Sequence, residues 1–398
     1  MTTAQEVYIY DVVRTARGKG REGGGLSTVK PVELLSQLYS ALDARGFNLA
    51  DVEDLILGCV TQTRDQGTNL AKVSALYAGL DARIPGVTLN RLCTSGLDSI
   101  LMAAGQLTSG MGGHLMLAGG IESMSRVPIF SDKGAWFADP EVAQKTRFVQ
   151  MGFAADVVAT QRGFTRRELD EWAASSHHKA ARAQKEGYFA RSIVPIHVEG
   201  VDTTFDQEEL IREGSSADAF EAMKPLFMDE RSHAWAIERF DALDDVKAMH
   251  HRGNSPALAD GAAMAILGTH RGDDLTPRGK VLSWATASVD PVEMLTGSIP
   301  ATKKALERAN LSVSDIDLIE VNEAFAAPTL AFIRELGVDA DRVNVNGGTI
   351  ALGHAMGATG TMLVASVLDE LERQDKRLGL VAVAGGAGVG SAMIVERA

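Results

Sequence analysis

Cysteine is scarce in this chain: among 398 residues only Cys59 and Cys93 carry a thiol. Two cysteines exclude a disulfide framework and a cysteine-rich zinc site, and they are typical of a protein in a reducing compartment. Basic residues are also in deficit, because 39 Lys and Arg stand against 52 Asp and Glu and give a formal net charge of −13. This balance excludes an overall basic surface for a nucleic-acid backbone but leaves room for a local basic pocket.

Long hydrophobic runs are absent as well. No apolar segment approaches the roughly 20 residues that cross a bilayer, and the first residues lack the basic-then-apolar order of a signal peptide. Hydrophobic residues nevertheless make up 45% of the chain, which is enough to bury a large core. We therefore expect a cytoplasmic protein with no membrane contact, built from two or three domains of roughly 100–200 residues each.

Strand and helix patterns alternate at both ends of the chain. In the first stretch the predicted strands cover 6–13, 54–60, 87–92 and 114–118, and the predicted helices cover 31–44, 69–79 and 95–109. In the last stretch the strands are 316–321, 379–384 and 391–396, and the helices are 301–309, 328–336 and 361–374. This alternation predicts an α/β fold, with a parallel or mixed sheet covered by helices.

The two stretches also resemble each other, which predicts an internal duplication. The matching segments are 51–56 with 314–319, 117–120 with 383–386, and the turn and helix of 93–109 with those of 354–374. A chance match of short dipeptides is the alternative, but three matches in the same order favour duplication.

Residues 121–251 between the two stretches are richer in charge. One helix is well marked there, because it begins at a capping box of Thr165 and Glu168 and stops at Gly187. We expect 228–251 to be irregular, the neighbouring histidines 177 and 178 to face water, and no histidine spacing to support a metal site. The region is predicted to be an insertion that covers one face of the duplicated core.

Cys93 is the first candidate for chemistry. It lies where a predicted strand ends and a helix begins, among the small residues Thr94, Ser95 and Gly96. The positive end of the helix dipole should lower the pKa of the thiol and favour the thiolate, as a nucleophile requires. The alternative is a buried and inert cysteine, which is the commoner role of a lone thiol.

Three further positions could act together with a nucleophile. His354 lies in the glycine-rich turn 346–360, where an imidazole has clearance to act as a general base; a helix-capping role is the alternative. Asn322 follows a predicted strand and could hold a water or donate to an oxyanion, or simply form a turn. The closing turn 384–390, which includes Gly386, offers exposed backbone N–H groups but is not a dinucleotide fingerprint, because no helix follows it.

Together these residues resemble the thiolase family. The resemblance rests on the segments 13–16, 90–96, 119–124, 322–325, 346–360 and the final glycine turn, and it covers essentially the whole chain. It implies a duplicated α/β thiolase fold, with two five-stranded mixed sheets in a layered αβαβα arrangement and an inserted loop domain. The corresponding division is a first half of 1–120 with 252–272, an insertion of 121–251, and a second half of 273–398. The resemblance also implies a homodimer or a homotetramer.

The resemblance implies residue roles in acyl transfer. Cys93 would take an acyl group from a coenzyme A thioester, which is a substrate rather than a cofactor, and His354 would activate the thiol. His354 and a water held by Asn322 would form one oxyanion hole, and the N–H groups of Cys93 and Gly386 would form the other. The residues implied at the acyl-CoA are Arg212, Met151, Gln150, Phe325 and Ser255.

The chain departs from the family pattern at the second catalytic cysteine. Ala384 stands where the family places that cysteine, Ala324 stands where a sister branch carries it, and Cys59 is predicted to be structural. In carbon–carbon bond chemistry the missing thiol is a general acid and base, a role commonly worth about 10²–10⁴-fold. Other departures lie near the expected coenzyme A, at Ala355, Pro256, Ala219 and Gln150. Delivery of the acyl group by an acyl carrier protein, or a modified mode of coenzyme A binding, is therefore an alternative.

We therefore predict a thiolase-family acyltransferase that acts on acyl-CoA or 3-ketoacyl-CoA thioesters through acyl-Cys93, by thiolytic cleavage or Claisen condensation. One alternative is a degenerate thiolase that acylates Cys93 but passes the acyl group to water or another nucleophile without carbon–carbon chemistry. The other is a non-catalytic, thioester-binding partner subunit.

Overall fold

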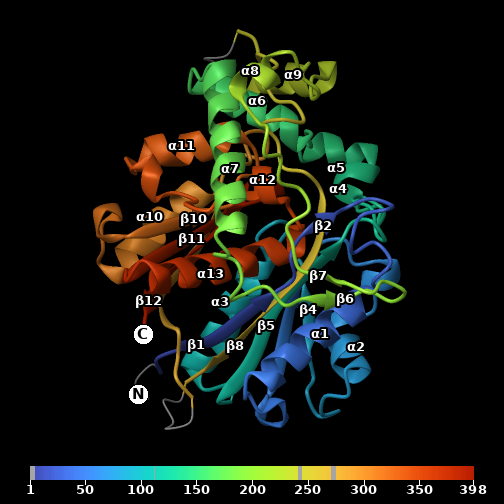
Figure 1. Cartoon of the computed structure of the whole chain (residues 1–398). Coiled ribbons are helices and arrows are strands. Elements are labelled where there is room, and N and C mark those ends of the chain that lie inside the picture. The colour runs from blue at the N-terminus through green and yellow to red at the C-terminus, as the bar shows by residue number, and fades with distance from the viewer. Residues whose placement is uncertain (1–4, 112, 241–243, 270–274) are drawn as a thin grey trace.

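The computed structural model describes residues 5–111, 113–240, 244–269 and 275–398. Its main strands form one mixed sheet in the order β10-β11-β12-β9-β1-β8-β5-β3-β4, with a short β2 paired to β8 (Figure 1). The strands of the first half are β1 (Tyr8–Arg14), β2 (Gly18–Lys19), β3 (Asp54–Gly58), β4 (Val87–Leu89), β5 (Leu115–Ser123) and β8 (Ala259–Gly268). Those of the second half are β9 (Gly279–Ser288), β10 (Leu318–Val321), β11 (Leu378–Ala384) and β12 (Val389–Arg397).

Equivalent strands occupy equivalent places in the two halves of this sheet. β3 runs parallel to β5 and β10 runs parallel to β11, and each pair continues antiparallel into β8 or β12. The halves join edge to edge where β1 pairs with β9, at Tyr8 opposite Lys280 and Ile9 opposite Gly279. The two sheets that the sequence predicts are therefore continuous; the matched segment 117–120 lies within β5, and 383–386 begins at the end of the equivalent strand β11.

β5 is longer than the sequence predicts. It continues from Leu115 to Ser123 and pairs with β8 along its whole length, through Gly119 and Gly120. These glycines serve close packing, because a Cβ at Gly119 would lie 2.2 Å from the carbonyl oxygen of Ala263. A glycine pair at the end of an apolar run therefore indicates here a crowded strand rather than a turn.

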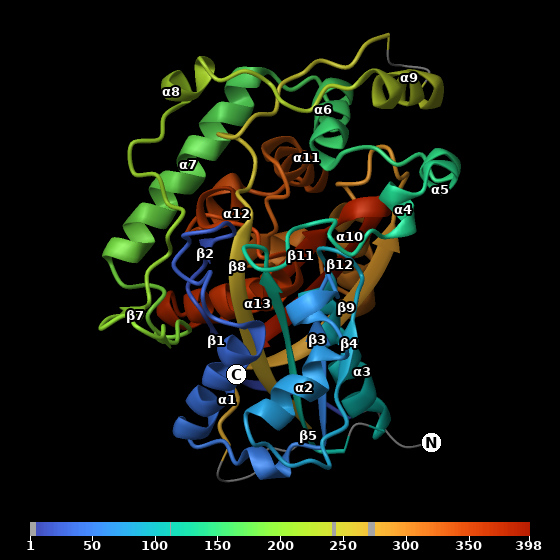
Figure 2. The same ribbon diagram turned by 90° about the vertical axis from the view of Figure 1, so that its right-hand side faces the viewer.

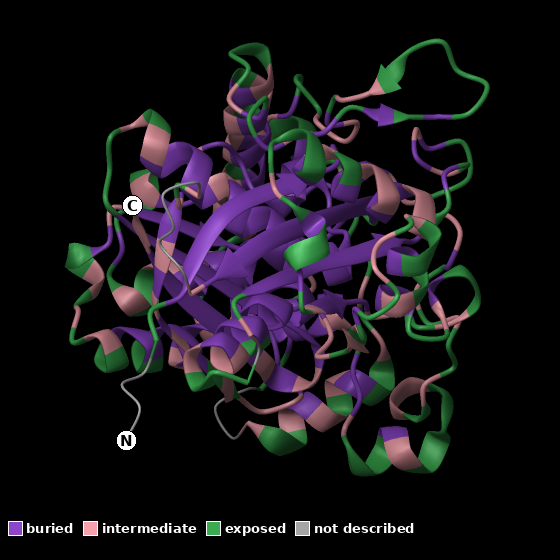
Figure 3. Cartoon of the chain, turned by 90° about the horizontal axis from the view of Figure 1, so that it is seen from below, coloured by how far each residue is buried: buried purple, intermediate pink, exposed green. Residues whose placement is uncertain are grey.

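The helices form layers on both sides of the folded sheet. α3 (Ser95–Ser109) and α13 (Met356–Arg373) contact each other and strands of both halves, so they form the middle layer. The outer layers contain α1 (Pro31–Ala44) and α2 (Leu70–Tyr77) on the first half, and α10 (Ser298–Ala309) with α11 (Ala326–Leu336) on the second. Figure 3 shows the buried strands at the centre and exposed residues on the surrounding helices. This arrangement is the predicted αβαβα order.

Residues 121–251 contain more helix than the sequence predicts. The helices are α4 (Ala135–Ala138), α5 (Pro140–Lys145), α6 (Met151–Gln161), α7 (Arg166–Lys185), α8 (Ala217–Glu221) and α9 (Glu230–Arg239), with the strand pair β6 (Ile196–His197) and β7 (Thr204–Phe205). Figure 2 shows α6, α8 and α9 together at one end of the molecule and α7 running beside the core. No helix in the described part of the chain is long and apolar enough to cross a membrane.

Two predictions for this region have different outcomes. The capping box of α7 is confirmed, since Thr165 and Glu168 bond reciprocally, and Gly187 follows with φ of 73°. The expectation of an irregular 228–251 is wrong over α9, which begins after the side-chain cap of Asp229. The domain boundaries stay a prediction, and the one at 272/273 lies outside the described residues.

A buried ion cluster fixes the segment after β7 to the first half. Glu208 Oε1 accepts hydrogen bonds from Arg14 Nη1 at 2.7 Å and Arg17 Nη1 at 2.8 Å, and Oε2 accepts from the Arg17 N–H at 2.7 Å. All three side chains are fully buried. Burial lowers the pKa of Arg17 to about 10, so its guanidinium group stays charged at neutral pH, and Glu208 is the carboxylate that bonds both arginines.

We predict that Glu208→Gln lowers the free energy of unfolding by about 3 kcal/mol or more, because it removes the carboxylate that bonds two buried guanidinium groups. The measurement is the denaturant midpoint followed by circular dichroism. Glu199→Gln, at an exposed position before β7, is the matched control and should leave the midpoint unchanged. Equal midpoints for the two variants would contradict a structural role of the cluster.

Candidate active site

Cys93 lies in a strained turn between β4 and α3. Leu92 has φ of +53°, and its N–H donates to Asn90 Oδ1 at 2.7 Å. Ser95 Oγ accepts from the Arg91 N–H at 2.8 Å and closes the turn from the other side. A left-handed leucine is unfavourable and persists only where its surroundings impose it. These bonds turn the Cys93 side chain out of the strand direction, just before the helix begins.

The thiol of Cys93 is protonated at neutral pH. Burial raises the pKa of Cys93 to about 11, although the N–H of Gly386 and its own N–H both donate toward the sulfur. The buried Glu122 adds a negative charge nearby. The prediction that the helix dipole lowers this pKa is therefore wrong for the unliganded protein, because loss of hydration outweighs the dipole. The two N–H groups remain placed where Cys93 and Gly386 were expected to donate.

His354 is a neutral imidazole with one free nitrogen. It lies between α12 (Thr349–Leu352) and α13, and its backbone N–H donates to the carbonyl oxygen of Ala257 at 2.8 Å. The Nδ1 atom is 2.8 Å from Thr359 Oγ1, whose own O–H donates to the Ala355 carbonyl at 3.1 Å. We therefore assign the ring proton to Nδ1. Burial lowers the pKa of His354 to about 4, and Nε2 is buried without a partner among the described residues.

Asn322, directly after β10, presents a side-chain amide nitrogen that has no hydrogen-bond partner among the described residues. Its Oδ1 accepts a hydrogen bond from Thr349 Oγ1 at 2.9 Å, which fixes the orientation of the amide. Its Nδ2 is buried and has no hydrogen-bond partner in the described part of the chain. A buried donor without a partner costs free energy, so it is expected to meet a water or a substrate oxygen.

An aromatic cavity of about 470 Å³ brings Cys93 and His354 together. We use this name for the space lined by both residues and by five phenylalanines at 130, 137, 148, 227 and 325. The predicted acyl-site residues Gln150, Met151 and Phe325 also lie in its wall. Ser255 does not: its hydroxyl is buried and unpaired, and the next residue, Pro256, lines the cavity instead.

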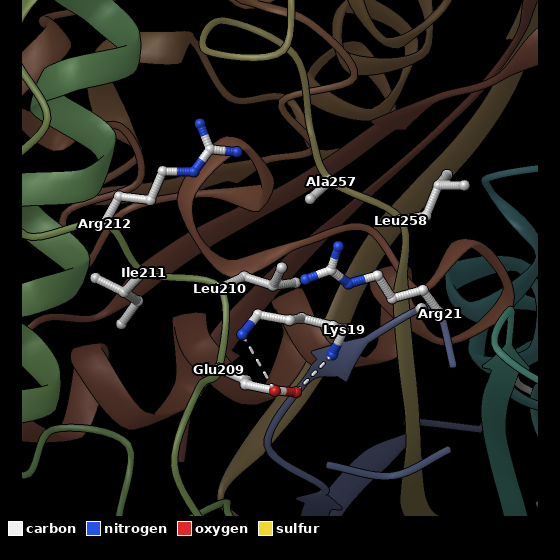
Figure 4. A pocket seen from close by; sticks show the side chains of 9 residues that line it. Lys19, Arg21, Glu209, Leu210, Ile211, Arg212, Ala257 and Leu258 are labelled. Atoms are coloured by element: carbon white, nitrogen blue, oxygen red, sulfur yellow. Dashed lines mark hydrogen bonds and ion pairs between the residues drawn. The ribbon is translucent and has the colours of Figure 1, made fainter. Parts of the chain in front are cut away.

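A second, basic cavity of about 540 Å³ lies beside the aromatic cavity, and the two share Leu258. Figure 4 shows Arg21 and Arg212 reaching into it from opposite sides, while Lys19 pairs with Glu209. Among the described residues neither arginine has an acidic partner, and the Arg212 guanidinium donates only to the Arg252 carbonyl, at 3.4 Å. Burial lowers the pKa of Arg212, yet an arginine keeps its charge at neutral pH. The cavity thus offers two unneutralised cations to an anionic ligand.

The sequence does not predict the roles of several residues that support the site. His177 is buried rather than exposed, which corrects the prediction, and its Nδ1 accepts the Arg212 N–H at 3.2 Å. His250 and His251 are also buried, in pairs with Asp156 at 2.7 Å and Asp170 at 2.8 Å. His250 and His251 lie outside the helices and strands, and their partners are 94 and 81 residues away, so no local pattern in the sequence marks these two roles.

The chain matches two family descriptions in succession: the thiolase N-terminal domain over residues 7–271 and the thiolase C-terminal domain over residues 275–397. The chain belongs to the thiolase family. Thiolases are acyltransferases that act on acyl-CoA or 3-ketoacyl-CoA thioesters, so the predicted family, fold class and enzyme class are confirmed.

Individual thiolases resemble the chain over its whole length. It is 37% identical to a 3-ketoacyl-CoA thiolase of Colwellia psychrerythraea, covering 98% of this chain and 99% of the relative. It is 38% identical to a beta-ketoadipyl-CoA thiolase of Pseudomonas knackmussii, covering 99% and 100%. The crystal structure of the Bacillus anthracis acetyl-CoA acetyltransferase superposes with a TM-score of 0.88 at 32% identity over the full length of both chains.

We predict that alkylation of Cys93 by iodoacetamide becomes about ten-fold faster per pH unit from about pH 6 to about pH 9, without a plateau. Only the thiolate reacts, and burial holds the pKa of Cys93 at about 11. The measurement is the rate of mass gain in a Cys59→Ala background. His354→Ala should keep the same slope, since His354 is uncharged in this range; a plateau near neutral pH would instead indicate a resting thiolate–imidazolium pair.

Proposed function

We propose that this thiolase transfers acyl groups through a covalent acyl-Cys93 intermediate. The observation that carries the proposal is that Cys93 and His354 line one cavity while His354 Nε2, buried, has no other partner among the described residues. A thiol with a pKa of about 11 needs a base at the moment of attack, and a neutral imidazole with a bare Nε2 is such a base. The protonated Nε2 then returns the proton to the leaving sulfur of coenzyme A.

Backbone and side-chain donors around Cys93 would stabilise the negative charge of the tetrahedral intermediate. The N–H groups of Cys93 and Gly386 already point at the sulfur and form one donor pair. The Asn322 amide, held by Thr349, and the protonated His354 would form the second, with a water between them. Loss of one such donor typically costs about 10²–10³-fold in rate. Only His354 moves a proton during acylation, so the proposal requires a coenzyme A thioester as substrate and no cofactor.

The basic cavity is proposed to hold the phosphates of coenzyme A. Arg21 and Arg212 supply the charge, and the pantetheine arm would pass Leu258, which the two cavities share. The backbone N–H of His354 donates to the carbonyl of Ala257, so the residue that carries the general base is bonded directly to the wall of this passage. Both cysteines are free, which agrees with the proposed location in the reducing cytoplasm.

Because of Ala384, this proposal expects normal acylation of Cys93 but slow carbon–carbon bond chemistry. It ends β11 opposite Gly390 and is buried, and the next residue, Gly385, lies against Cys93, since a Cβ there would be 3.2 Å from the Cys93 nitrogen. A methyl group at this place can neither remove nor donate a proton. Acylation needs only Cys93, His354 and the donors, so we propose that it proceeds normally while thiolysis and condensation are slow.

We predict that mixing the protein with acetyl-CoA adds one acetyl group to Cys93, as intact mass and peptide mapping would show. Cys93→Ala should abolish the adduct and Cys59→Ala should retain it. The absence of an adduct with both acetyl-CoA and a 3-ketoacyl-CoA, together with no loss of thioester, would contradict the enzymatic proposal and favour a non-catalytic subunit.

We further predict that Ala384→Cys raises the rate of thiolysis of a 3-ketoacyl-CoA by about 10²–10⁴-fold, because it restores a general acid and base. The control Ala392→Cys adds a buried thiol on β12 and should leave thiolysis unchanged. An unchanged rate in Ala384→Cys, with acylation intact, would show that position 384 does not perform this role.

A homodimer is proposed through the open edge of the sheet. β4 is the last strand in the order, and Val87 on it is 45% exposed. Beside it α2 presents Val73, Leu76 and Tyr77 at 41%, 51% and 55% exposure on one helical face. Apolar residues clustered at an unpaired edge are typical of a surface that a second copy covers.

Light scattering after size exclusion should therefore give the mass of two chains, or of four if dimers pair again. Tyr77→Glu combined with Leu76→Glu should reduce it to one chain, whereas Val201→Glu, at an exposed position elsewhere, should not. A wild-type mass of one chain at micromolar concentration would contradict the proposal.

A further inference from the structure

The lining of the aromatic cavity is more restrictive than acyl transfer alone requires. Apart from Cys93 and His354, Gln150 is the one lining residue with a polar side chain, and no lining residue carries a charge. The remaining lining residues are aliphatic, aromatic, Gly152 and Pro256. An acyl group attached to Cys93 in this cavity would therefore meet hydrocarbon on nearly every side.

The aromatic walls are fixed by their own packing. The rings of Phe130 and Phe137 lie 4.5 Å apart on one side, and those of Phe227 and Phe325 lie 5.7 Å apart, edge to face, on another. Phe227 packs directly on α6, because a Cβ at Gly152 would fall 2.2 Å from its ring. Rings in mutual contact of this kind hold their positions, so the cavity is preformed rather than shaped by a ligand.

Among the described residues, no charged side chain lines the aromatic cavity itself. Arg147 precedes the lining residue Phe148 and pairs with Glu238 through Nη2 at 3.5 Å, while its Nη1 is buried without a partner among the described residues; Arg147 itself does not line the cavity. A smaller cavity of about 60 Å³, which shares Cys93 and Met151 with the aromatic cavity, is lined by Asp132, whose negative charge would repel a carboxylate. A carboxylate at the far end of an acyl chain would thus be buried without a counter-charge.

The size of the aromatic cavity suits a chain much longer than acetyl. An apolar cavity of about 150 Å³ accommodates benzene, or roughly 25 Å³ per carbon atom. On that scale about 470 Å³ corresponds to about 19 carbon atoms, so a chain of about eight carbons or more fits together with the thioester at Cys93.

We propose that Cys93 prefers uncharged hydrocarbon acyl groups, increasingly so up to about eight carbons or more, and rejects acyl groups that end in a carboxylate. The proposal rests on the acyl-Cys93 intermediate and specifies its substrate class. Relatives at 37% and 38% identity carry the names 3-ketoacyl-CoA thiolase and beta-ketoadipyl-CoA thiolase, so overall similarity does not separate the two classes. The lining of the cavity does.

The chemical step is the same for every acyl group, which makes the comparison direct. A bond forms between Cys93 Sγ and the thioester carbon while the bond from that carbon to the sulfur of coenzyme A breaks. The thiol proton passes to His354 Nε2 and then to the departing sulfur, and nothing is oxidised or reduced. Rate differences between acyl-CoA substrates therefore report how the cavity receives the chain.

The test compares hexanoyl-CoA with adipyl-CoA, which have equal chain length and differ in a terminal methyl or carboxylate. The rate of Cys93 acylation, followed by intact mass, should be about 100-fold or more higher with hexanoyl-CoA, since an unpaired buried carboxylate is strongly unfavourable. From acetyl-CoA to octanoyl-CoA the specificity constant should rise by up to about four-fold per methylene. Adipyl-CoA within about ten-fold of hexanoyl-CoA, or a fall from acetyl to octanoyl, would overturn the proposal.

Acetyl-CoA separates this proposal from the one on which it rests. If no acyl-CoA, including acetyl-CoA, modifies Cys93, the acyl-enzyme itself is wrong; if all modify it equally, only the substrate class is wrong.

A second experiment compares a substitution in the cavity wall with a control substitution one residue away. Phe227→Arg places a cation in the wall and should raise the adipyl-to-hexanoyl rate ratio by about ten-fold or more, as a new charge-assisted partner would. The control Leu226→Arg adds the same charge one residue away, at a position 50% exposed and outside the lining, and should leave the ratio unchanged. An equal effect of both variants would show that the ratio responds to overall charge and not to this cavity.

Discussion

The close contact between the starts of α3 and α13 is the constraint on which the active site depends. A Cβ at Gly360 would lie 2.2 Å from the nitrogen of Leu97, and one at Gly96 would lie 2.5 Å from the carbonyl oxygen of Gly357. Only glycine permits backbones to approach so closely. Cys93 and His354 each lie two residues before one of these helices, so the contact between the helices sets the position of nucleophile and base together.

Each half of the protein adds a buried carboxylate that holds the loops at this contact. Glu122, in β5, accepts the N–H groups of Val60, Thr61 and Gly357 at 3.0 to 3.1 Å. Glu323, after β10, accepts Trp172 Nε1, Ser176 Oγ and the Ile350 N–H at 2.8 to 3.0 Å. Burial raises the pKa of both groups. The same burial raises the pKa of Cys93 and lowers that of His354, so nucleophile and base are both uncharged at rest and charges separate only when a substrate is attacked.

Local patterns in the sequence predict the parts of this arrangement that are local in the fold. Cys93, His354 and Asn322 stand out because each lies at a junction of strand, turn and helix, and such junctions can be recognised from a few neighbouring residues. The roles of His177 and Thr349 cannot, because they depend on which distant segment packs against them. The direction of the Cys93 pKa shift is missed for a similar reason: the helix start is visible in the sequence, whereas burial depends on the whole fold. β5 shows the same limit, since its glycines are required by α13 and β8 rather than by a turn.

The two cavities divide recognition between charge and shape. The protein carries a net charge of −13, yet Arg21 and Arg212 face one cavity without acidic partners, so an anionic ligand has a defined place on an otherwise acidic surface. The aromatic cavity contains no charged lining residue and can distinguish acyl groups only by their apolar surface and their length. Leu258 and the backbone of Ala257 belong to the boundary between the cavities, and Ala257 holds His354. The short segment before β8 therefore contributes to binding of the carrier, to recognition of the acyl chain and to orientation of the base. The other residues that perform these functions come from both halves and from the segment between them.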